Sequence, residues 1–334
     1  MIDSIKIERF RCFNETELTG FRRLNLFGGK NNAGKTSLLE AIYLGLKADK
    51  KAIKQMRSKG NDEDSETYLH YQAVTNNSFF ISIKDSESIS LSKFEFNYNK
   101  PDVIFEKGTE KHSGNFKDHI AGKAMTFPSK TFIDNNRVSF ILAKDNQFPI
   151  SYDLSHQFNE ADRRGESDEI LNSIKLIDDS IDELKTYSDR SDIFLRKKGE
   201  KHRLPLPYFG DALQKMMRYA ITAATLHSEN GSSEIKKYLL IDEIENGLHY
   251  TVHDEFWEML FKLAIAYNIQ IFAATHSREM IEAFNRISQK DDFKGEAAYF
   301  ELFKHVKTGE IAGHIIEADV LDYKLKNNKS LRGE

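Results

Sequence analysis

The sequence contains a single cysteine, Cys12, which excludes an internal disulfide and a zinc site built from cysteines. It also lacks any run of about 18 apolar residues, the length that a membrane-spanning helix requires. The first residues, MIDSIKIERFRCF, mix acids with bases and lack the apolar stretch of a secretory signal. From these absences we expect a cytoplasmic protein without a membrane partner.

No charge of one sign dominates, because 48 Lys and Arg side chains stand against 52 Asp and Glu, a net charge of −4. A strongly cationic nucleic-acid-binding protein is therefore disfavoured, although a local basic groove could exist within a balanced total. Internal repeats and low-complexity tracts are also absent. What the 334 residues do contain is a 40% hydrophobic share with 24 Phe and 13 Tyr, enough for the core of one large domain or two intertwined ones.

The N-terminal half predicts short strands around one helix. Strands are expected at 5–10, 24–27, 79–83, 94–98 and 103–105, and the helix at 37–46. Polar turns between the last three strands favour an antiparallel meander. The charged stretch 47–66 is expected at the surface, and 127–167, with Pro128 and Pro149, is expected to be irregular.

A heptad spacing predicts a helix at 168–187. Its apolar positions are Ile170, Ile174, Ile177, Ile181 and Leu184. They span only about two heptads, fewer than a coiled coil needs, so an amphipathic helix packed on its own domain is favoured over a partner-docking helix.

Helices and strands alternate in the C-terminal third. We expect helices at 210–226, at 250–266 and from 277, strands at 238–241 and 269–274, and then edge strands at 297–303 and 314–316 before a terminal helix. Such alternation indicates a mostly parallel sheet covered by helices.

A phosphate-binding loop is the strongest local signal. The pattern G-x-x-x-x-G-K-[ST] is formed by Gly29, Lys30, Asn31, Asn32, Ala33, Gly34, Lys35 and Thr36, and Ser37 follows on the predicted helix. In such a loop, amide N–H groups and the helix N-terminus bind phosphates. We expect Lys35 to reach the β- and γ-phosphates of ATP and Thr36 to hold Mg²⁺. Asn32 stands where many such loops have glycine, and asparagine tolerates the left-handed backbone required there.

An acidic pair, Asp242 and Glu243, follows the apolar strand 238–241. Ligands bind at the carboxyl ends of buried parallel strands, so Asp242 is expected to meet Mg²⁺ through its water shell. Glu243 is expected to polarise the attacking water. The next strand ends in Thr275-His276-Ser277, which would bring His276 to the γ-phosphate.

A zinc site on His249 and His253 is a competing hypothesis, because the two stand four residues apart on a predicted helix. No glutamate follows His249 in the manner of H-E-x-x-H. An interface or supporting role for His249 is therefore favoured.

Taken together, these motifs resemble the ABC-type ATPases of the SMC/RecF/OLD group, and most closely the short OLD-like ATPases of bacterial phage-defence operons. The resemblance covers 10–42, 239–250 and 270–284. It implies an α/β P-loop fold of the ABC/SMC-head type, with a mixed sheet wrapped by helices, an antiparallel β subdomain and an inserted helical lobe. We expect one ATPase domain over 1–334: a nucleotide-binding lobe from 1–60 and 205–334, and an inserted meander and helical lobe from 61–204.

The resemblance also implies that two subunits sandwich two ATP molecules, as a homodimer or a higher homo-oligomer. Gly210 and Asp211 would then form a turn that contacts the partner's nucleotide, with Tyr208 in the usual place of a serine. Asn246 and His249 match the family's dimer-contacting loop, and Arg11 matches an arginine that can approach the phosphates. The lobe-linking glutamine has no clear counterpart, and the stretch 135–137 is only a candidate for it.

Two family features are missing from the sequence. The predicted helix at 168–187 is too short for SMC-type arms, and the chain ends too soon after Arg286 for a C-terminal Toprim nuclease. We therefore expect ATP hydrolysis that switches a separate effector, such as a Toprim nuclease, in phage defence. Tyr208 in the usual place of the serine predicts that this hydrolysis is slow. The alternatives are a RecF-like DNA-engaging ATPase, which salt-dependent DNA binding would distinguish, and a transporter-type cassette. The transporter reading is weakened because the sequence lacks a Ser-Gly-Gly-Gln turn.

Overall fold

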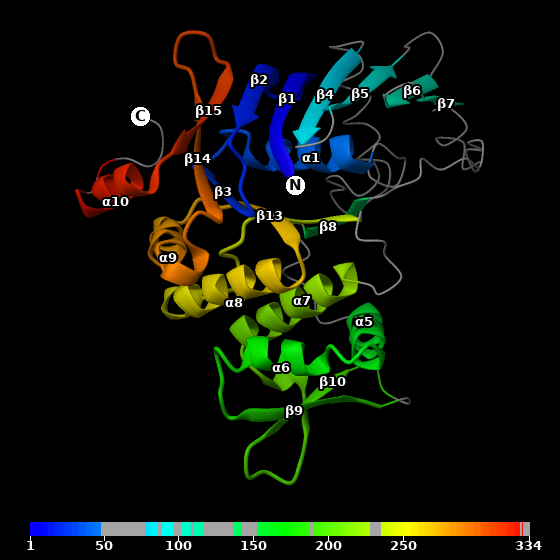
Figure 1. Ribbon diagram of the computed structural model, residues 1–334, viewed down its shortest axis with the longest axis vertical. Helices are drawn as coiled ribbons and strands as arrows, with labels where there is room; N and C mark the ends of the chain where they lie inside the picture. The colour runs from blue at the N-terminus through cyan, green and yellow to red at the C-terminus, as the bar shows by residue number, and fades with distance from the viewer. Residues whose placement is uncertain are drawn as a thin grey trace.

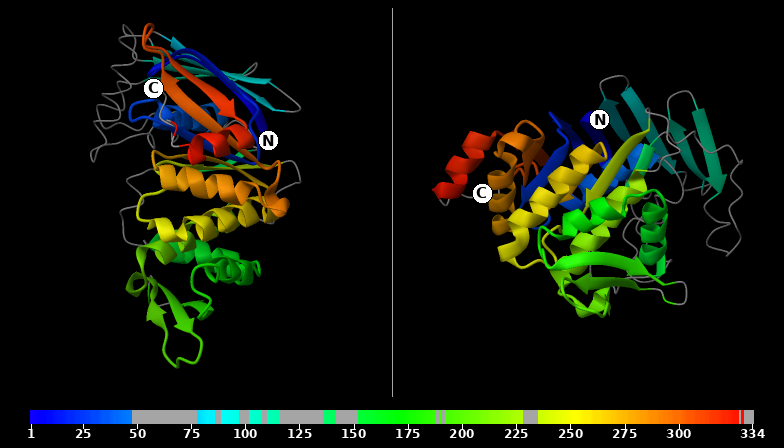
Figure 2. Two further views of the ribbon diagram at one scale, coloured as in Figure 1. Left: turned by 90° about the vertical axis from the view of Figure 1, so that its left-hand side faces the viewer. Right: turned by 60° about the horizontal axis from the view of Figure 1, so that its bottom comes forward.

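The computed structural model describes residues 1–47, 78–85, 89–96, 102–107, 110–115, 136–141, 152–187, 190, 192–227, 235–327 and 329. Its layers are stacked along the long axis of the molecule (Figures 1 and 2). The surface excursion expected at 47–66 lies outside the described residues beyond Lys47. The described residues include no helix that combines the length and the hydrophobicity of a membrane span.

A six-stranded sheet in the order β15-β14-β3-β13-β12-β8 forms the middle layer. Its strands are β3 (Leu24–Gly29), β8 (Asn136–Ile141), β12 (Lys236–Ile241), β13 (Ile269–Ala274), β14 (Ala297–Lys304) and β15 (Ile311–Ile316). All neighbours in it are parallel except β14 and β15. Every residue of β3 and β13 is buried, as expected for strands covered on both faces. The predicted, mostly parallel sheet is confirmed.

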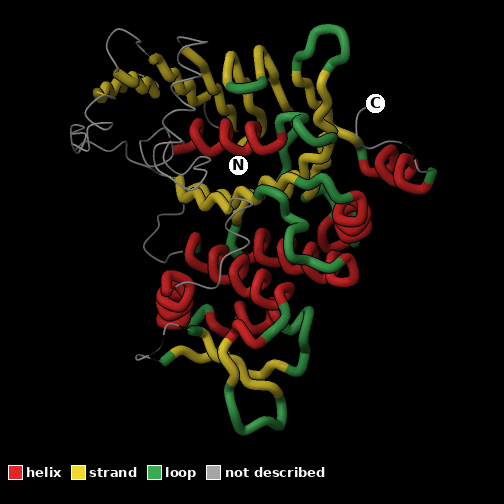
Figure 3. Tube along the Cα trace, turned by 180° about the vertical axis from the view of Figure 1, so that it is seen from behind, coloured by secondary structure: helices red, strands yellow, loops and turns green. Residues whose placement is uncertain are grey.

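A second, antiparallel sheet covers one face of this layer, in the order β2-β1-β4-β5-β6-β7. Its strands are β1 (Ile2–Phe10), β2 (Phe13–Thr19), β4 (Ser78–Asp85), β5 (Ile89–Phe96), β6 (Asp102–Lys107) and β7 (Glu110–Asn115). The predicted meander is thus confirmed, and it continues the N-terminal hairpin because β4 pairs with β1. Helix α1 (Lys35–Lys47) lies between the two sheets and is buried nearly all round (Figure 3).

Helices cover the opposite face of the central sheet. They are α7 (Asp211–Leu226), α8 (His253–Ala266, after the short 3₁₀ turn Tyr250–Val252) and α9 (Arg278–Ser288). Beyond them lie α5 (Tyr152–Arg163), α6 (Ser167–Ile174) and a small sheet of β9 (Ile181–Thr186), β10 (Ile193–Lys197) and β11 (Leu204–Pro205) (Figure 1). Helix α10 (Ala318–Lys326) packs beside α9. The predicted helices at 210–226 and 250–266 and the helix from 277 are confirmed.

The helix predicted at 168–187 is wrong in its second half. Helix α6 ends at Ile174, and the chain turns and continues as β9, which pairs with β10. The turn that leads into β9 is formed at Asp178, whose carboxylate accepts hydrogen bonds from the backbone and hydroxyl of Ser180. Ile170 and Ile174 are buried on α6 and Ile181 is buried on β9. The heptad spacing therefore arose from buried residues of two successive elements and not from one continuous helix.

Two further expectations are corrected. The stretch 127–167, expected to be irregular, contains β8 and α5, and β8 obtains its order from pairing with β12. The predicted strand 297–303 is not at the edge, since β14 lies between β3 and β15 and its middle is buried. The edge position belongs to β15.

Candidate nucleotide-binding site

The phosphate-binding loop joins the carboxyl end of β3 to the first turn of α1. Asn32 has a φ of 66°, so the expected left-handed backbone is confirmed, and Gly34 has a φ of 88°. A Cβ at Gly29 would collide with the backbone carbonyl of Leu302, which makes glycine necessary at that position. The loop follows a buried strand and opens a buried helix, the context that a phosphate-binding loop requires.

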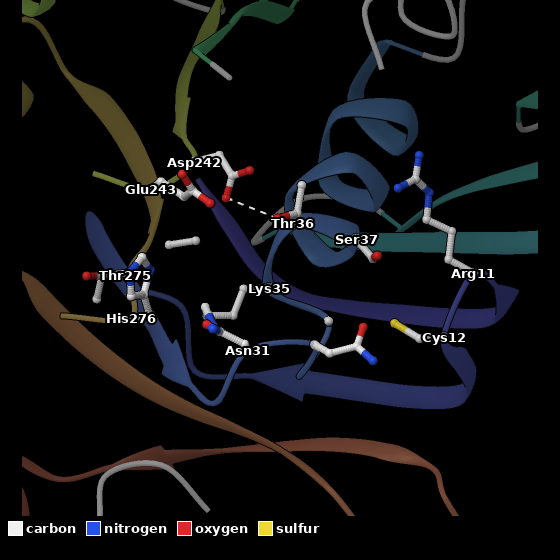
Figure 4. Close-up of a pocket in the computed structure, with 13 residues that line it drawn as sticks. Arg11, Cys12, Asn31, Lys35, Thr36, Ser37, Asp242, Glu243, Thr275 and His276 are labelled. Carbon is white, nitrogen blue, oxygen red and sulfur yellow. Dashed lines mark hydrogen bonds between the residues drawn. The ribbon is translucent and has the colours of Figure 1, made fainter. Parts of the chain in front are cut away.

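Around this loop lies a cavity that collects most of the predicted site (Figure 4). It is lined by Arg11, Cys12, Asn31, Asn32, Gly34, Lys35, Thr36, Ser37, Asp242, Glu243, Ala274, Thr275 and His276. These residues come from the loop and the start of α1, from the end of β12, from the end of β13 and from the turn between β1 and β2. Segments more than 200 positions apart are joined because β13 lies between β3 and β12 in the sheet.

The Lys35 ammonium folds over the loop, donating hydrogen bonds to the carbonyl oxygens of Gly29 and Lys30, both at 2.9 Å. Burial lowers the pKa of Lys35, and the nearby carboxylates of Glu245, Asp242 and Glu243 oppose this shift. The cation is therefore held at the loop by backbone oxygens and by the surrounding acids.

The two predicted metal ligands are brought together. The Thr36 hydroxyl donates a hydrogen bond of 3.2 Å to Oδ1 of Asp242, which is buried directly after β12 (Figure 4). A hydroxyl and a carboxylate at one point supply the hard oxygen ligands that Mg²⁺ prefers. These residues fit the ion that the sequence suggested. The competing zinc hypothesis gains no support: His249 precedes α8 rather than sharing a helix with His253. The described residues also contain no cluster of three or more His, Cys, Asp or Glu side chains that could hold a metal.

Glu243 is held in an unusual backbone conformation, with a φ of 48°. Its carboxylate accepts a 2.6 Å hydrogen bond from the side-chain amide of Asn246. A left-handed glutamate costs free energy and persists only where neighbouring contacts enforce it. Asn246, predicted from the resemblance to contact a second subunit, orients the candidate catalytic carboxylate within its own subunit.

His276 contacts a carboxylate that the sequence reasoning did not assign to the chemistry. Its Nδ1 lies 2.8 Å from Oε1 of Glu245, while its backbone N–H donates to the same oxygen at 2.9 Å. The Thr275 hydroxyl donates to Oε2 at 2.7 Å. The signal available in the sequence was a third acid two positions after Glu243, on the same turn.

Lys215 was also missed. It projects from α7 into the protein, where its side chain is 7% exposed, and donates hydrogen bonds to the carbonyl oxygens of Ile244, at 2.7 Å, and Asn246. Burial lowers its pKa to about 7. The available signal was a charged residue on the otherwise apolar, buried face of the predicted helix 210–226.

Other predicted residues lie at the margin of the cavity or outside it. Arg11 lines the cavity (Figure 4). Its guanidinium nevertheless forms a buried ion pair with Glu40 of α1. Gly210 and Asp211 begin α7 and do not line the cavity, and the His249 ring bonds the Thr251 hydroxyl at 2.9 Å. Of the candidate stretch 135–137, the structure describes Asn136 and Arg137, which begin β8 and pair with Lys236 and Lys237 at the amino end of β12, whereas the phosphate loop follows the carboxyl end of β3.

A family model matches residues 24–282, described as "AAA domain, putative AbiEii toxin, Type IV TA system". The chain belongs to this family of AAA domains. Over their full lengths, the chain is 24% identical to a Helicobacter pylori protein named ATP/GTP phosphatase. A segment of 43 residues, 13% of this chain and 12% of the relative, is 46% identical to the DNA replication and repair protein RecF of Idiomarina loihiensis.

Among solved structures, the chain resembles an Smc head domain from Pyrococcus furiosus, which has an extended coiled coil and is bound to the C-terminal domain of ScpA. The TM-score is 0.55 at 10% identity, covering 98% of this chain and 99% of that one. The predicted α/β fold of the ABC/SMC-head type is confirmed. At this identity the likeness concerns the fold alone.

Proposed function

We propose that the protein binds ATP with Mg²⁺ and hydrolyses it slowly, as a nucleotide-dependent switch that controls a separate effector in bacterial phage defence. The observation that carries this proposal is the meeting of Lys35, Thr36, Asp242, Glu243 and His276 around one cavity. A full-length relative named as an ATP/GTP phosphatase supports the hydrolytic part. Support for the defence role comes from the OLD-like motifs and from the toxin–antitoxin description of the family.

Each residue has a distinct task in this mechanism. The loop amides and the N-terminus of α1 would bind the phosphates, and Lys35 would exchange its carbonyl partners for phosphate oxygens. Thr36 and Asp242 would hold Mg²⁺, which would neutralise charge on the phosphates. The Glu243 carboxylate, which Asn246 orients, would accept a proton from the attacking water. His276 would lie beside the γ-phosphate and accept a hydrogen bond from the attacking water.

A homodimer would complete the site. Gly210 and Asp211 open a 16-residue helix with no side-chain cap, which leaves amide N–H groups at its start for an anion from a second subunit. Tyr208 stands beside this turn and is 77% exposed, where the related ATPases have a serine. A bulky phenol in place of a small hydroxyl is our reason for proposing a slow rate.

The test compares ATP binding with phosphate release in three variants. Lys35→Ala should abolish binding, because the triphosphate loses its principal cation. Glu243→Gln should keep binding and lower the rate of phosphate release by 10² to 10⁴-fold, roughly the contribution of a general base. Lys262→Ala, on an exposed part of α8, is the matched control and should behave like the parent. If both site variants released phosphate at the parental rate, the site assignment would be wrong.

A further inference from the structure

We infer that Glu245 is the positioning residue that fixes the ring orientation and the tautomer of His276, and that Lys215 holds Glu245 in place from α7. The inference rests on the proposed function and adds two residues to it. Neither residue lines the cavity, so both act through the groups that do.

The contacts of Glu245 all lead to the end of β13. One carboxylate oxygen accepts from the backbone N–H of His276 and lies 2.8 Å from its ring Nδ1, and the other accepts from the Thr275 hydroxyl. The Glu245 side chain is 11% exposed, whereas that of His276 is 49% exposed. The Glu245 carboxylate is thus mostly buried, whereas the His276 ring that it contacts lines the cavity.

This geometry determines where the ring proton sits. An ionised carboxylate can only accept hydrogen bonds, so the nitrogen facing Glu245, Nδ1, must carry a proton. In this tautomer Nε2 carries a lone pair, so in the cavity it can only accept a hydrogen bond, for example from the attacking water. For histidines that bind a metal, removing such an orienting partner typically lowers activity by about 10 to 100-fold, and we expect an effect of this size for His276.

Lys215 fixes the backbone on both sides of Glu245. Its ammonium donates hydrogen bonds to the carbonyl oxygens of Ile244 and Asn246, the residues immediately before and after Glu245. On the other side, the Ile244 N–H donates to the Ala274 carbonyl at the end of β13, at 3.0 Å. The peptide carrying Glu245 is therefore tied to α7 and to the strand that ends at His276.

The first readout is the ring nitrogen spectrum of the full-length protein labelled with ¹⁵N-histidine, with the His276 signal identified by its loss in His276→Asn. We expect a protonated Nδ1 in the parent. In Glu245→Ala we expect the Nδ1 signal to move towards the unprotonated value as the Nε2–H tautomer becomes populated. Glu279→Ala is the matched control, because that carboxylate accepts from Ser277 without touching the His276 ring.

The second readout is kinetic. In Glu245→Ala the turnover number for ATP should fall about 10 to 100-fold. This change should exceed the change in the dissociation constant for ATP, because Glu245 bonds to Thr275 and His276 and acts on Lys35 through its charge. Lys215→Met should change both readouts in the same direction. A His276 signal and a turnover number that stay parental in Glu245→Ala would overturn the inference for Glu245, and the same result in Lys215→Met would overturn it for Lys215.

Glu245→Gln covers the case in which the alanine variant does not fold, since it keeps the shape and one accepting oxygen. A smaller movement of the same ring signal is expected, and an unmoved signal with parental turnover contradicts the inference. Failure of the proposed function looks different: Lys35→Ala and Glu243→Gln would then release phosphate like the parent. The tautomer measurement needs no ATP and reports on Glu245 in either event.

Discussion

Asn32 and Glu243, which both line the nucleotide cavity, are non-glycine residues with a left-handed backbone. Asparagine bears this conformation with little strain, whereas a β-branched side chain does not. The loop therefore depends on the residue type at position 32 through its backbone more than through its side chain.

We predict that Asn32→Gly keeps ATP affinity near the parental value, and that Asn32→Val weakens both affinity and folding. The strain of a β-branched residue at a φ of 66° should lower the free energy of unfolding by roughly 1 to 3 kcal/mol. Urea unfolding and ATP titration of the two variants measure this. Equal behaviour of glycine and valine would show that the left-handed backbone is not required.

Lys215 also makes stability depend on pH. Its pKa is about 7 in the folded protein and near 10.5 in the unfolded chain, so between these values the folded protein carries fewer protons. Unfolding takes up a proton in this window, and the free energy of unfolding therefore rises with pH. Glu245 and Glu243 favour the charged lysine, whereas burial and Arg218 oppose it.

Between pH 7 and pH 9, the free energy of unfolding of the parent should rise by roughly 2 kcal/mol more than that of Lys215→Met, because the variant lacks this titrating group. Denaturant unfolding of both proteins at the two pH values gives the difference, in which other titrating groups cancel. Parallel stability curves for the two proteins would contradict a lowered lysine pKa.

At the scale of the element, α1 is fitted closely against the antiparallel sheet. A Cβ on Gly45 would lie 2.7 Å from Cγ2 of Ile81 and 2.7 Å from Cδ1 of Ile83, two buried side chains of β4. Since an α-helix and a sheet strand meet here without a gap, glycine is required for packing even though it weakens a helix.

Gly45→Ala should lower the free energy of unfolding, because overpacking costs about 1 to 3 kcal/mol and the gain in helix propensity is at most about 1 kcal/mol. Ile83→Val removes one of the two colliding atoms and should recover part of the loss when combined with Gly45→Ala. Thermal unfolding of the single and double variants tests this. If Gly45→Ala were instead more stable than the parent, the side chains of β4 would have to move aside for the added methyl group at little cost.

At the scale of the whole molecule, the turn at 210–211 and the phosphate loop of one chain belong to different layers of the fold. The loop lies at the end of β3 in the central sheet, and the turn opens α7 in the helical layer and does not line the cavity (Figure 1). An ATP-dependent dimer would bring each turn to the partner's cavity.

We predict that Glu243→Gln shifts from monomer to dimer in light scattering only when Mg-ATP is added. Slow hydrolysis in this variant would keep the closed dimer intact, and Lys35→Ala is the control that should not shift. A dimer already present without ATP would indicate a fixed scaffold. A persistent monomer would show that the turn beside Tyr208 does not close the site unaided.

The sequence alone determined the features of this protein that depend on residues close together along the chain. The phosphate loop with its left-handed Asn32, the buried strands at 238–241 and 269–274, and the acids and histidine that follow them were all predicted from spacing and residue type. Such features depend on near neighbours along the chain and on the burial pattern of one strand or helix.

Tertiary structure decided what depends on contacts between distant segments. Pairing with β10 and a turn at Asp178 made residues 181–186 a strand rather than the end of a helix, and pairing with β12 ordered β8. In the same way, Arg11 is drawn to Glu40, and Lys215 meets the peptides around Glu245 from another element. A charged residue on the buried face of a helix must find a polar partner inside the protein, because water is excluded there. The sequence shows that such a partner is needed, but only the packing of the helix shows which residue it is.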